Sequence, residues 1–309
     1  MAKRIAITGA SGFVGKAIVH EAASRGFAVH AIVRSENEKL VGENVSTFKG
    51  DLFDAASLDR AMKDCDAVIH LVGIIAEQPS KGVTFQRMHV EGTRAAIEAT
   101  KRAGIKRYIH MSANGTRPDA VSEYHKTKFA AEQLVKASGL DWTIFRPSMI
   151  HGPKGEFTKM ETDWAKGKSV PWVAMPYFGA GLLGTGGAGK LQPVFVNDVA
   201  RAFVDALVNE KTVNQTYAIC GNETVTWPQM HKTFAAALAD KPNRATIAIP
   251  AWYAKAIATI VPGGLLPFNK DQVQMSQEDN VADMTGFSTD FGWTPRGLGE
   301  TVGLYANHP

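Results

Sequence analysis

Cysteine is scarce in this chain, which has only Cys65 and Cys220 among its 309 residues. Both lie in apolar stretches, and neither has the spacing of a metal ligand, a pattern that is typical of a reducing compartment. The nine histidines include no pair on one helix face. We therefore expect no metal site.

Long apolar runs are also missing. No segment approaches the roughly 20 apolar residues that a transmembrane helix needs. Residues 251–268 come nearest, and Pro262, Gly263 and Gly264 interrupt them. This segment is a candidate apolar surface for a protein partner or a membrane edge.

Neither sign of charge dominates the chain. Its 34 basic and 30 acidic residues give a formal net charge of +4, which is too small and too scattered to predict a nucleic-acid partner. The first apolar strand begins at residue 4 and leaves no room for a signal peptide ahead of it. We expect a cytoplasmic protein, with attachment to the surface of the inner membrane as an open alternative.

The chain does contain a regular alternation of apolar strands and amphipathic helices. Strands are predicted at 4–7, 28–33, 45–48, 67–72, 108–111 and 142–145, with helices between most of them. Repeated units of this length predict an α/β fold, a doubly wound parallel sheet of Rossmann type with helices on both faces.

The most informative segment follows the first strand and reads Thr8-Gly9-Ala10-Ser11-Gly12-Phe13-Val14-Gly15. Gly9 would permit a sharp turn, Gly12 a close approach of the backbone to a pyrophosphate, and Gly15 close packing of the next helix on the sheet. The unpaired N–H groups and the positive dipole end of that helix would face the phosphates. The segment predicts a dinucleotide site.

The composition changes after residue 150, where prolines become frequent and a glycine-rich stretch, 179–189, fits a lid and a long surface loop equally well. We predict an NAD(P)-binding Rossmann domain at 1–150. A smaller substrate-side lobe would follow at 151–309, with a return into the Rossmann sheet at about 191–208.

Tyr124 and Lys128 lie four residues apart on a helix predicted at 122–138, so they share one face. A tyrosine beside an ammonium group has a lowered pKa, which prepares the phenol for proton transfer to or from a carbonyl. Lys128 would also reach the ribose of a nicotinamide nucleotide. Because the pair follows the fourth βα unit, near the strand ends where such sheets bind ligands, we favour catalysis over an exposed surface pair.

Arg34 ends the second predicted strand. An acidic residue at this place would bind the ribose 2′-OH of NAD, whereas an arginine would pair with the 2′-phosphate of NADP. Glu36 and Glu38 follow but lie beyond the strand end. The sequence therefore favours NADP(H) over NAD(H).

Together, these motifs resemble the short-chain dehydrogenase/reductase superfamily, in its extended or atypical branch with NAD-dependent epimerase/dehydratases. Further matches, over nearly the whole chain, lie at Asp51-Leu52, Leu71-Val72-Gly73, 89–93, 146–153, 192–199 and 270–281. The last two segments are most similar to the group of the NADPH-binding accessory subunit of respiratory complex I and its bacterial relatives.

The resemblance implies a role for individual residues. The catalytic pair would be Tyr124 and Lys128, with Ser112 as a stand-in for the catalytic hydroxyl of the family. The pyrophosphate would be contacted by Gly9, Ser11, Gly12, Phe13 and Val14. The adenine would be contacted by Asp51 and Leu52, and the adenosine ribose by Leu71, Val72 and Gly73. Arg34 and Lys128 would contact the cofactor as above, and Pro147, Ser148 and Met149 would contact its nicotinamide end.

Two departures from the family pattern bear on activity. The catalytic hydroxyl usually lies one or two residues beyond the place of Ser112, where this chain has Ala113 and Asn114. His89 stands where the family usually has asparagine, as in the complex I-like group. We interpret His89 as a packed helix residue rather than a catalyst.

Two functions stay open on these grounds. The favoured one is an oxidoreductase that transfers a hydride between NADP(H) and a carbonyl, enone or quinone-like small molecule, with Tyr124 as proton donor or acceptor. The alternative is a catalytically silent, nucleotide-bound structural or assembly factor of a respiratory or membrane-edge complex. A redox-sensing or RNA-binding relative of the same fold is a third reading, which no specific motif favours.

Overall fold

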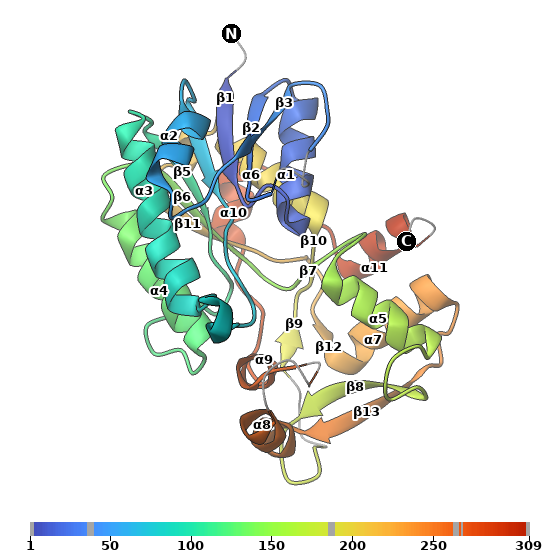
Figure 1. Ribbon diagram of the computed structural model, residues 1–309. Helices are drawn as coiled ribbons and strands as arrows, with labels where there is room; N and C mark the ends of the chain where they lie inside the picture. Colours follow the sequence, from blue (N-terminus) through green and yellow to red (C-terminus); the bar gives the residue numbers. More distant parts are fainter. Residues whose placement is uncertain (1–2, 36–39, 185–188, 262–265, 267, 307–309) are drawn as a thin grey trace.

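The computed structural model describes residues 3–35, 40–184, 189–261, 266 and 268–306 (Figure 1). Three features of the sequence fall partly outside these ranges. They are Glu36 and Glu38, the middle of the glycine-rich stretch, and residues 262–265 and 267 of segment 251–268.

A parallel sheet of seven strands forms the centre of the molecule, in the order β11-β6-β5-β4-β1-β2-β3. The strands are β1 (Arg4–Thr8), β2 (Ala28–Val33), β3 (Val45–Lys49), β4 (Ala67–His70), β5 (Arg107–Met111), β6 (Asp141–Pro147) and β11 (Gln215–Ile219). The chain builds outward from β1 to β3 and then returns to β4 beside β1, so the strand order reverses there. The predicted doubly wound fold is confirmed, and such sheets bind ligands at this reversal, beyond the carboxyl ends of the strands.

Alternate side chains of the strands enter two separate cores. Ile5 and Ile7 of β1 lie in one core and Ala6 lies in the other, because successive strand residues point to opposite faces. The first core includes residues of α1 (Phe13–Ser24), α6 (Val196–Ala206) and α10 (Thr285–Phe291), and the second includes residues of α2 (Ala55–Met62), α3 (Gly92–Arg102) and α4 (Glu123–Lys136). Helices therefore cover both faces of the sheet, as Figure 1 shows.

Local signals set the ends of several helices. The Asp54 side chain accepts a hydrogen bond from the Ser57 N–H and caps α2, and Ser122 caps α4 in the same way. The chain enters α3 through a π-helical turn, η3 (Gln86–Glu91).

The segment at about 191–208, predicted to return to the sheet, begins with two short strands, β9 (Lys190–Leu191) and β10 (Val194–Phe195). Pro193 lies between them and has no N–H to donate to a ladder. Strand β9 pairs with β12 (Val225–Thr226) and β10 with β7 (Ile150–His151), outside the central sheet. The later chain returns to that sheet through α6, which packs on it, and through β11.

A smaller second lobe lies beyond the carboxyl ends of the central strands, at the bottom of Figure 1. Besides the short strands, it contains α5 (Glu156–Lys166), β8 (Ala174–Gly179), α7 (Trp227–Ala239), β13 (Ala245–Pro250), α8 (Ala251–Ile260), α9 (Lys270–Met275) and α11 (Leu298–Val302). The described residues also form the short turns η2 (Pro79–Lys81), η4 (Glu210–Thr212) and η5 (Gly303–Tyr305). Phe13, at the start of α1, packs against the core of this lobe around Phe195 and Phe234, so α1 contacts both parts of the molecule.

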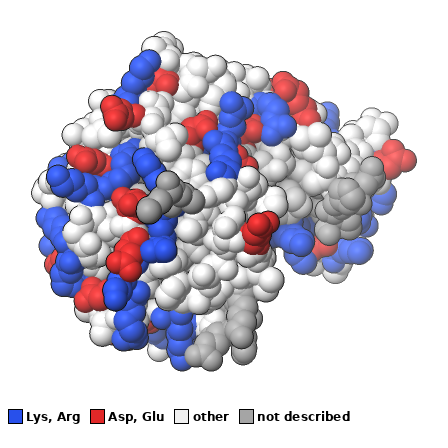
Figure 2. All heavy atoms as spheres, turned by 90° about the horizontal axis from the view of Figure 1, so that it is seen from above, with Lys and Arg blue, Asp and Glu red and all other residues white. Residues whose placement is uncertain are grey.

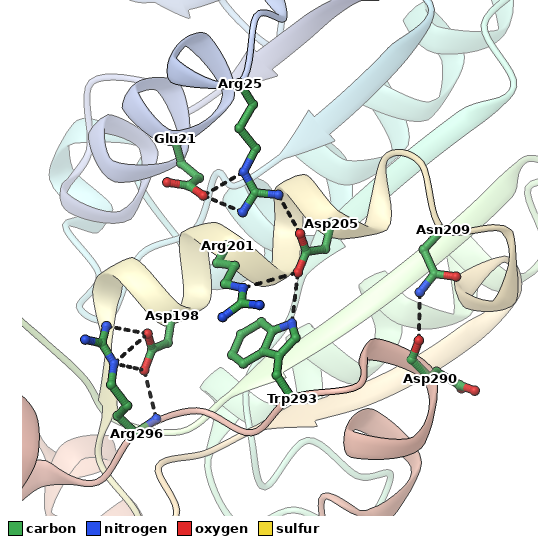
Figure 3. Close-up of polar contacts among 9 residues, drawn as sticks. All are labelled: Glu21, Arg25, Asp198, Arg201, Asp205, Asn209, Asp290, Trp293 and Arg296. Atoms are coloured by element: carbon green, nitrogen blue, oxygen red, sulfur yellow. Dashed lines mark hydrogen bonds and ion pairs between the residues drawn. The ribbon is translucent and has the colours of Figure 1, made fainter.

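The last part of the chain is fastened to α6 by carboxylates (Figure 3). Asp205 accepts hydrogen bonds from the Arg25 guanidinium at 2.5 Å and from the Trp293 indole at 2.9 Å. Asp198 accepts hydrogen bonds from the backbone N–H and the guanidinium of Arg296. These contacts tie the end of α1 and the segment after α10 to the same helix.

Figure 2 shows the face at the amino ends of the strands, where basic and acidic side chains are interspersed. Neither sign of charge forms a continuous surface there. Among the described residues, no helix is both long and apolar enough to cross a bilayer.

The packing of α1 predicts the result of a single substitution. A Cβ on Gly15 would lie 2.1 Å from the Gly9 carbonyl oxygen, whereas a Cβ on the helical Gly286 would meet no atom within 4 Å. We expect Gly15→Ala to lower the free energy of unfolding by about 1–3 kcal/mol. Gly286→Ala should leave it unchanged or raise it by up to about 1 kcal/mol. Urea unfolding of both variants measures the difference, and equal stabilities would contradict the packing described here.

Candidate functional site

The turn between β1 and α1 has the geometry of an anion site. Gly9 has a φ of +75°, and the Gly12 N–H donates to the Gly9 carbonyl at 3.1 Å. No side chain caps α1 at Gly12, so the first N–H groups of the helix are available to a phosphate. A Cβ on Gly12 would meet only the Gly9 oxygen, at 3.3 Å. The outer side of the turn is therefore open to a ligand.

The loop after β4 lies directly against this turn. The Leu71 carbonyl carbon and the Val72 nitrogen are each 3.3 Å from the place of a Cβ on Gly9. A Cβ on Gly73 would lie 2.9 Å from the Lys128 Nζ. The structure thus brings together the glycine turn, the loop at 71–73 and Lys128, which are far apart in the sequence.

Other residues that the sequence assigns to the cofactor lie along the same edge of the sheet. Arg34 is exposed directly after β2, and Asp51 and the nearly buried Leu52 follow β3. Pro147 ends β6, and the Ser148 hydroxyl donates to the Gln192 carbonyl; Met149 follows and is partly buried. Ser11 and Val14, in the glycine turn and α1, are also partly buried. The contacts of these residues with a cofactor stay a prediction.

Phe13 has a defined place that the sequence does not indicate. Its ring lies 2.9 Å from the place of a Cβ on Gly155 and 3.3 Å from one on Gly152. The absence of side chains at these two glycines makes room for the ring. Phe13 therefore connects the phosphate turn to the second lobe.

Lys128 is buried beneath the edge of the site, with its side chain directed at β5. Its Nζ donates to the Met111 carbonyl at 3.0 Å. Burial lowers the pKa of Lys128 to about 8, and the carboxylate of Glu132 acts in the opposite direction. The ammonium therefore loses its proton near pH 8 and is mostly charged at pH 7.

Glu132 is a functional candidate that the sequence reading missed. Its fully buried carboxylate accepts hydrogen bonds from the Ser112 hydroxyl at 2.6 Å and from two nitrogens of Arg146 at 2.8 and 2.6 Å. A signal was present in the sequence, because Tyr124, Lys128 and Glu132 are spaced by four and share one face of α4.

Tyr124 is partly buried against aromatic rings. Its ring meets those of Phe85, His89 and His125 edge-on, with centroids 5.9, 5.4 and 5.2 Å away. Burial raises the pKa of the Tyr124 phenol to about 12. The prediction that Lys128 lowers this pKa is wrong, since burial dominates and the Lys128 ammonium is directed to the Met111 carbonyl.

Ser112, Ala113 and Asn114 follow β5, and their side chains are buried or hydrogen-bonded within the protein. The Ser112 hydroxyl donates to Glu132, and Ala113 is buried. The Asn114 amide donates to the Asn280 side chain at 2.8 Å. Neither Ala113 nor Asn114 supplies a hydroxyl, and a catalytic role for Ser112 stays a prediction.

His89 is buried on η3 and contacts two parts of the site. Its ring nitrogens lie 2.9 Å from the Thr127 hydroxyl on α4 and 3.1 Å from the backbone of Ile74. Burial and the nearby Lys128 charge lower its pKa, so it is neutral at pH 7. His89 is a packed residue, as the sequence indicates, and it also supports the Tyr124 ring.

Comparison with known proteins agrees with this geometry. The sequence pattern described as NAD(P)H-binding matches residues 9–171, from the glycine turn to the second lobe. The chain belongs to this NAD(P)H-binding family. The match extends over more than half of the chain and includes both the phosphate turn and the Tyr124–Lys128 helix.

Two curated relatives are informative. The chain is 25% identical to the mitochondrial NADH-ubiquinone oxidoreductase 40 kDa subunit of Neurospora crassa, over 90% of this chain and 71% of that protein. It is 35% identical to ceramide reductase of Caulobacter vibrioides, over 48% of this chain and 47% of that protein. The chain thus spans about half to seven-tenths of these relatives.

Solved structures share the fold at lower identity. The structure of MoeE5 with UDP-glucose and NAD has a TM-score of 0.76 and 21% identity, and the match covers 98% of this chain and 97% of that one. UDP-glucose 4-epimerase of Thermotoga maritima has a TM-score of 0.74 and 19% identity, with 99% and 98% covered. These structures confirm the predicted fold, and the match to the 40 kDa subunit confirms the resemblance to complex I subunits.

The open space above Gly12 generates a prediction. We expect Gly12→Val to abolish nucleotide binding, because an isopropyl group would occupy the place of the pyrophosphate. The fold should persist, since the added Cβ meets one atom, at 3.3 Å. Calorimetric titration with NADPH and NADH, beside far-UV circular dichroism, measures both properties. Unchanged affinity in a folded variant would show that the nucleotide does not lie over this turn.

Proposed function

We propose that this protein is an NADPH-dependent reductase of a carbonyl, enone or quinone-like small molecule. One observation carries the proposal: Tyr124, Lys128 and Glu132 form a single stripe on α4, and the stripe reaches the loop at 71–73 beside the glycine turn. A structural role alone does not explain a buried ammonium at this place. Strongly shifted pKa values of this kind are typical of active sites.

The protonation of Tyr124 favours the reductive direction. With a pKa of about 12, the phenol carries its proton at neutral pH. NADPH, when bound, would supply the hydride to the carbonyl carbon. Tyr124 would donate its proton to the carbonyl oxygen, so that one hydride and one proton convert a ketone to an alcohol.

Lys128 would support this step by positioning the nucleotide. Below about pH 8 its side chain carries a positive charge next to Gly73. Its ammonium would donate a hydrogen bond to a ribose hydroxyl of the nucleotide.

The names of the relatives favour an apolar substrate. They include ceramide reductase, sterol demethylase protein B of Methylococcus capsulatus, and a ketoreductase of Stigmatella aurantiaca that acts on a farnesyl-bearing 3-oxo compound. The names of the complex I subunits include ubiquinone. We therefore propose a lipophilic carbonyl compound or quinone as the substrate class.

A second candidate function is a nucleotide-bound structural subunit of a respiratory or membrane-edge complex. The contacts of Ser112 and Asn114 favour it, because the Ser112 hydroxyl donates to Glu132 and Asn114 supplies no hydroxyl. The mitochondrial complex I relatives favour it as well. Turnover by the purified protein decides between the two functions.

The substitution Tyr124→Phe tests the reductase directly. It should leave the nucleotide bound and lower turnover by about 10²–10⁴-fold, because the proton donor is lost. Tyr177→Phe, a change to a partly buried tyrosine on β8, is the matched control and should keep full activity. The assay is the oxidation of NADPH by a panel of ketones, enones and quinones. If no acceptor oxidises NADPH in the unmodified protein, the structural function is correct instead.

Arg34 tests the choice of cofactor. Because Arg34 is exposed directly after β2, it would pair with the 2′-phosphate, and Arg34→Ala should weaken NADPH binding by about 1.5–3 kcal/mol. NADH binding should hardly change. Equal losses for the two nucleotides in calorimetric titrations would show that Arg34 does not select the cofactor.

A further inference from the structure

Helix α8 differs from an ordinary surface helix, because it buries a small residue and exposes its large apolar residues. Ala254 is buried against the protein, whereas Trp252, Tyr253 and Ile260 are 55%, 50% and 81% exposed. A surface helix usually turns its large apolar residues inward. At 100° per residue, Trp252, Ala256, Ile260 and Tyr253 follow one another around a single outer face. The fold therefore leaves the larger side chains of α8 for another surface.

The loop after β8 extends this outer face. Leu182 and Leu183 are 78% and 74% exposed, and the Trp252 indole donates to the Leu182 carbonyl at 3.0 Å. We call Leu182, Leu183, Trp252, Tyr253 and Ile260 the apolar tip. It lies at the free end of the second lobe, around α8 at the bottom of Figure 1.

The strand pair β8–β13 carries a second exposed group, at its other end. Val170, Trp172 and Val173 precede β8 and are more than half exposed. The Arg244 guanidinium, just before β13, donates to the Trp172 carbonyl. Apolar side chains are therefore exposed at both ends of this strand pair.

The charge of this unit is of one sign. Residues 166–184 and 241–261 contain Lys166, Lys168, Lys241, Arg244 and Lys255 and no aspartate or glutamate. The whole chain has a net charge of +4, so the remainder sums to −1. Lys255 lies on α8 itself, and the other four lie before β8 and β13, at the end of the strand pair that exposes Val170, Trp172 and Val173.

We propose that the apolar tip docks on the surface of an anionic lipid bilayer. Tryptophan and tyrosine prefer the boundary between headgroups and acyl chains, and the positive charges of Lys255 and of the basic residues at the other end of the strand pair would be attracted to anionic headgroups. With ten residues, α8 is too short to span a bilayer. It would instead lie in the interface, with its outer face in the lipid.

Contacts in the second lobe connect the docking helix, through α9, to the loop that borders the candidate site. Helix α9 packs beside α8, and the Asn269 side chain at its start lies 3.4 Å from the Ile75 carbonyl in the loop after β4. An apolar substrate would then meet the protein at the bilayer. The docking itself does not depend on the proposed reductase activity.

Vesicle flotation of the full chain tests the proposal. We expect binding to vesicles of phosphatidylcholine with phosphatidylglycerol, weaker binding to phosphatidylcholine alone, and a decrease with added salt. Ile260→Glu should reduce the partition into the anionic vesicles by at least about tenfold, because a carboxylate would enter the lipid. Val208→Glu, at a valine after α6 that is 60% exposed, is the matched control and should bind as the parent does.

Two results would overturn the proposal. One is equal partition of the Ile260→Glu variant and the parent. The other is a parent protein that binds neither kind of vesicle but forms a dimer that Ile260→Glu disrupts. That result would show that the apolar tip contacts a second copy of the chain. NADPH affinity, measured on each variant, shows that the nucleotide-binding fold is intact.

Discussion

The candidate site depends on one buried carboxylate, that of Glu132. A carboxylate without partners would be strongly disfavoured at full burial. Here Ser112 at the end of β5 and Arg146 on β6 both donate to it, so the contact joins α4 to two neighbouring strands. One turn before it on the same helix, Lys128 lies in the field of this carboxylate, which opposes the lowering of the lysine pKa by burial. The Glu132 carboxylate thus both connects α4 to the sheet and favours the charged form of Lys128.

The buried Lys128 ammonium destabilises the fold, and a purely structural subunit would not need it. The pKa of Lys128 is lowered from about 10.5 in water to about 8 in the folded protein. The protonated lysine therefore destabilises the fold at neutral pH, and its contribution to stability improves as the pH rises from about 8 to above 10. Destabilising groups of this kind concentrate where chemistry needs them. For this reason the reductase explains the site better than a structural subunit does.

The sequence predicts the fold where the determining interactions are local. The glycine turn, the strands and the Asp54 cap follow from residues that are neighbours in the chain, and so does the close packing of Gly15. Sequence reasoning fails where distant segments meet. The pKa of Tyr124 is set by Phe85 and other buried surroundings that its own helix does not reveal.

The second lobe shows the same limit. Hydropathy indicates that 251–268 is apolar, but only the fold shows that Trp252 and Ile260 point outward and that Leu182 lies beside them. The division of 191–196 into two strands could have been predicted, because Pro193 stands between them. The spacing of Glu132 from Lys128 was likewise visible in the sequence. Its burial beside Arg146 was not.

The pH dependence of NADPH oxidation, compared between the unmodified protein and Glu132→Gln, tests the central claim most directly. Glutamine keeps the shape of the side chain, and its single oxygen can still accept from Ser112 and from one nitrogen of Arg146. Its amide nitrogen cannot accept the second Arg146 hydrogen bond, and the substitution removes the charge that raises the pKa of Lys128. The account predicts that activity declines above about pH 8 in the unmodified protein and that this decline moves to lower pH in Glu132→Gln. A decline at the same pH in both proteins, or activity that rises with pH, would contradict it.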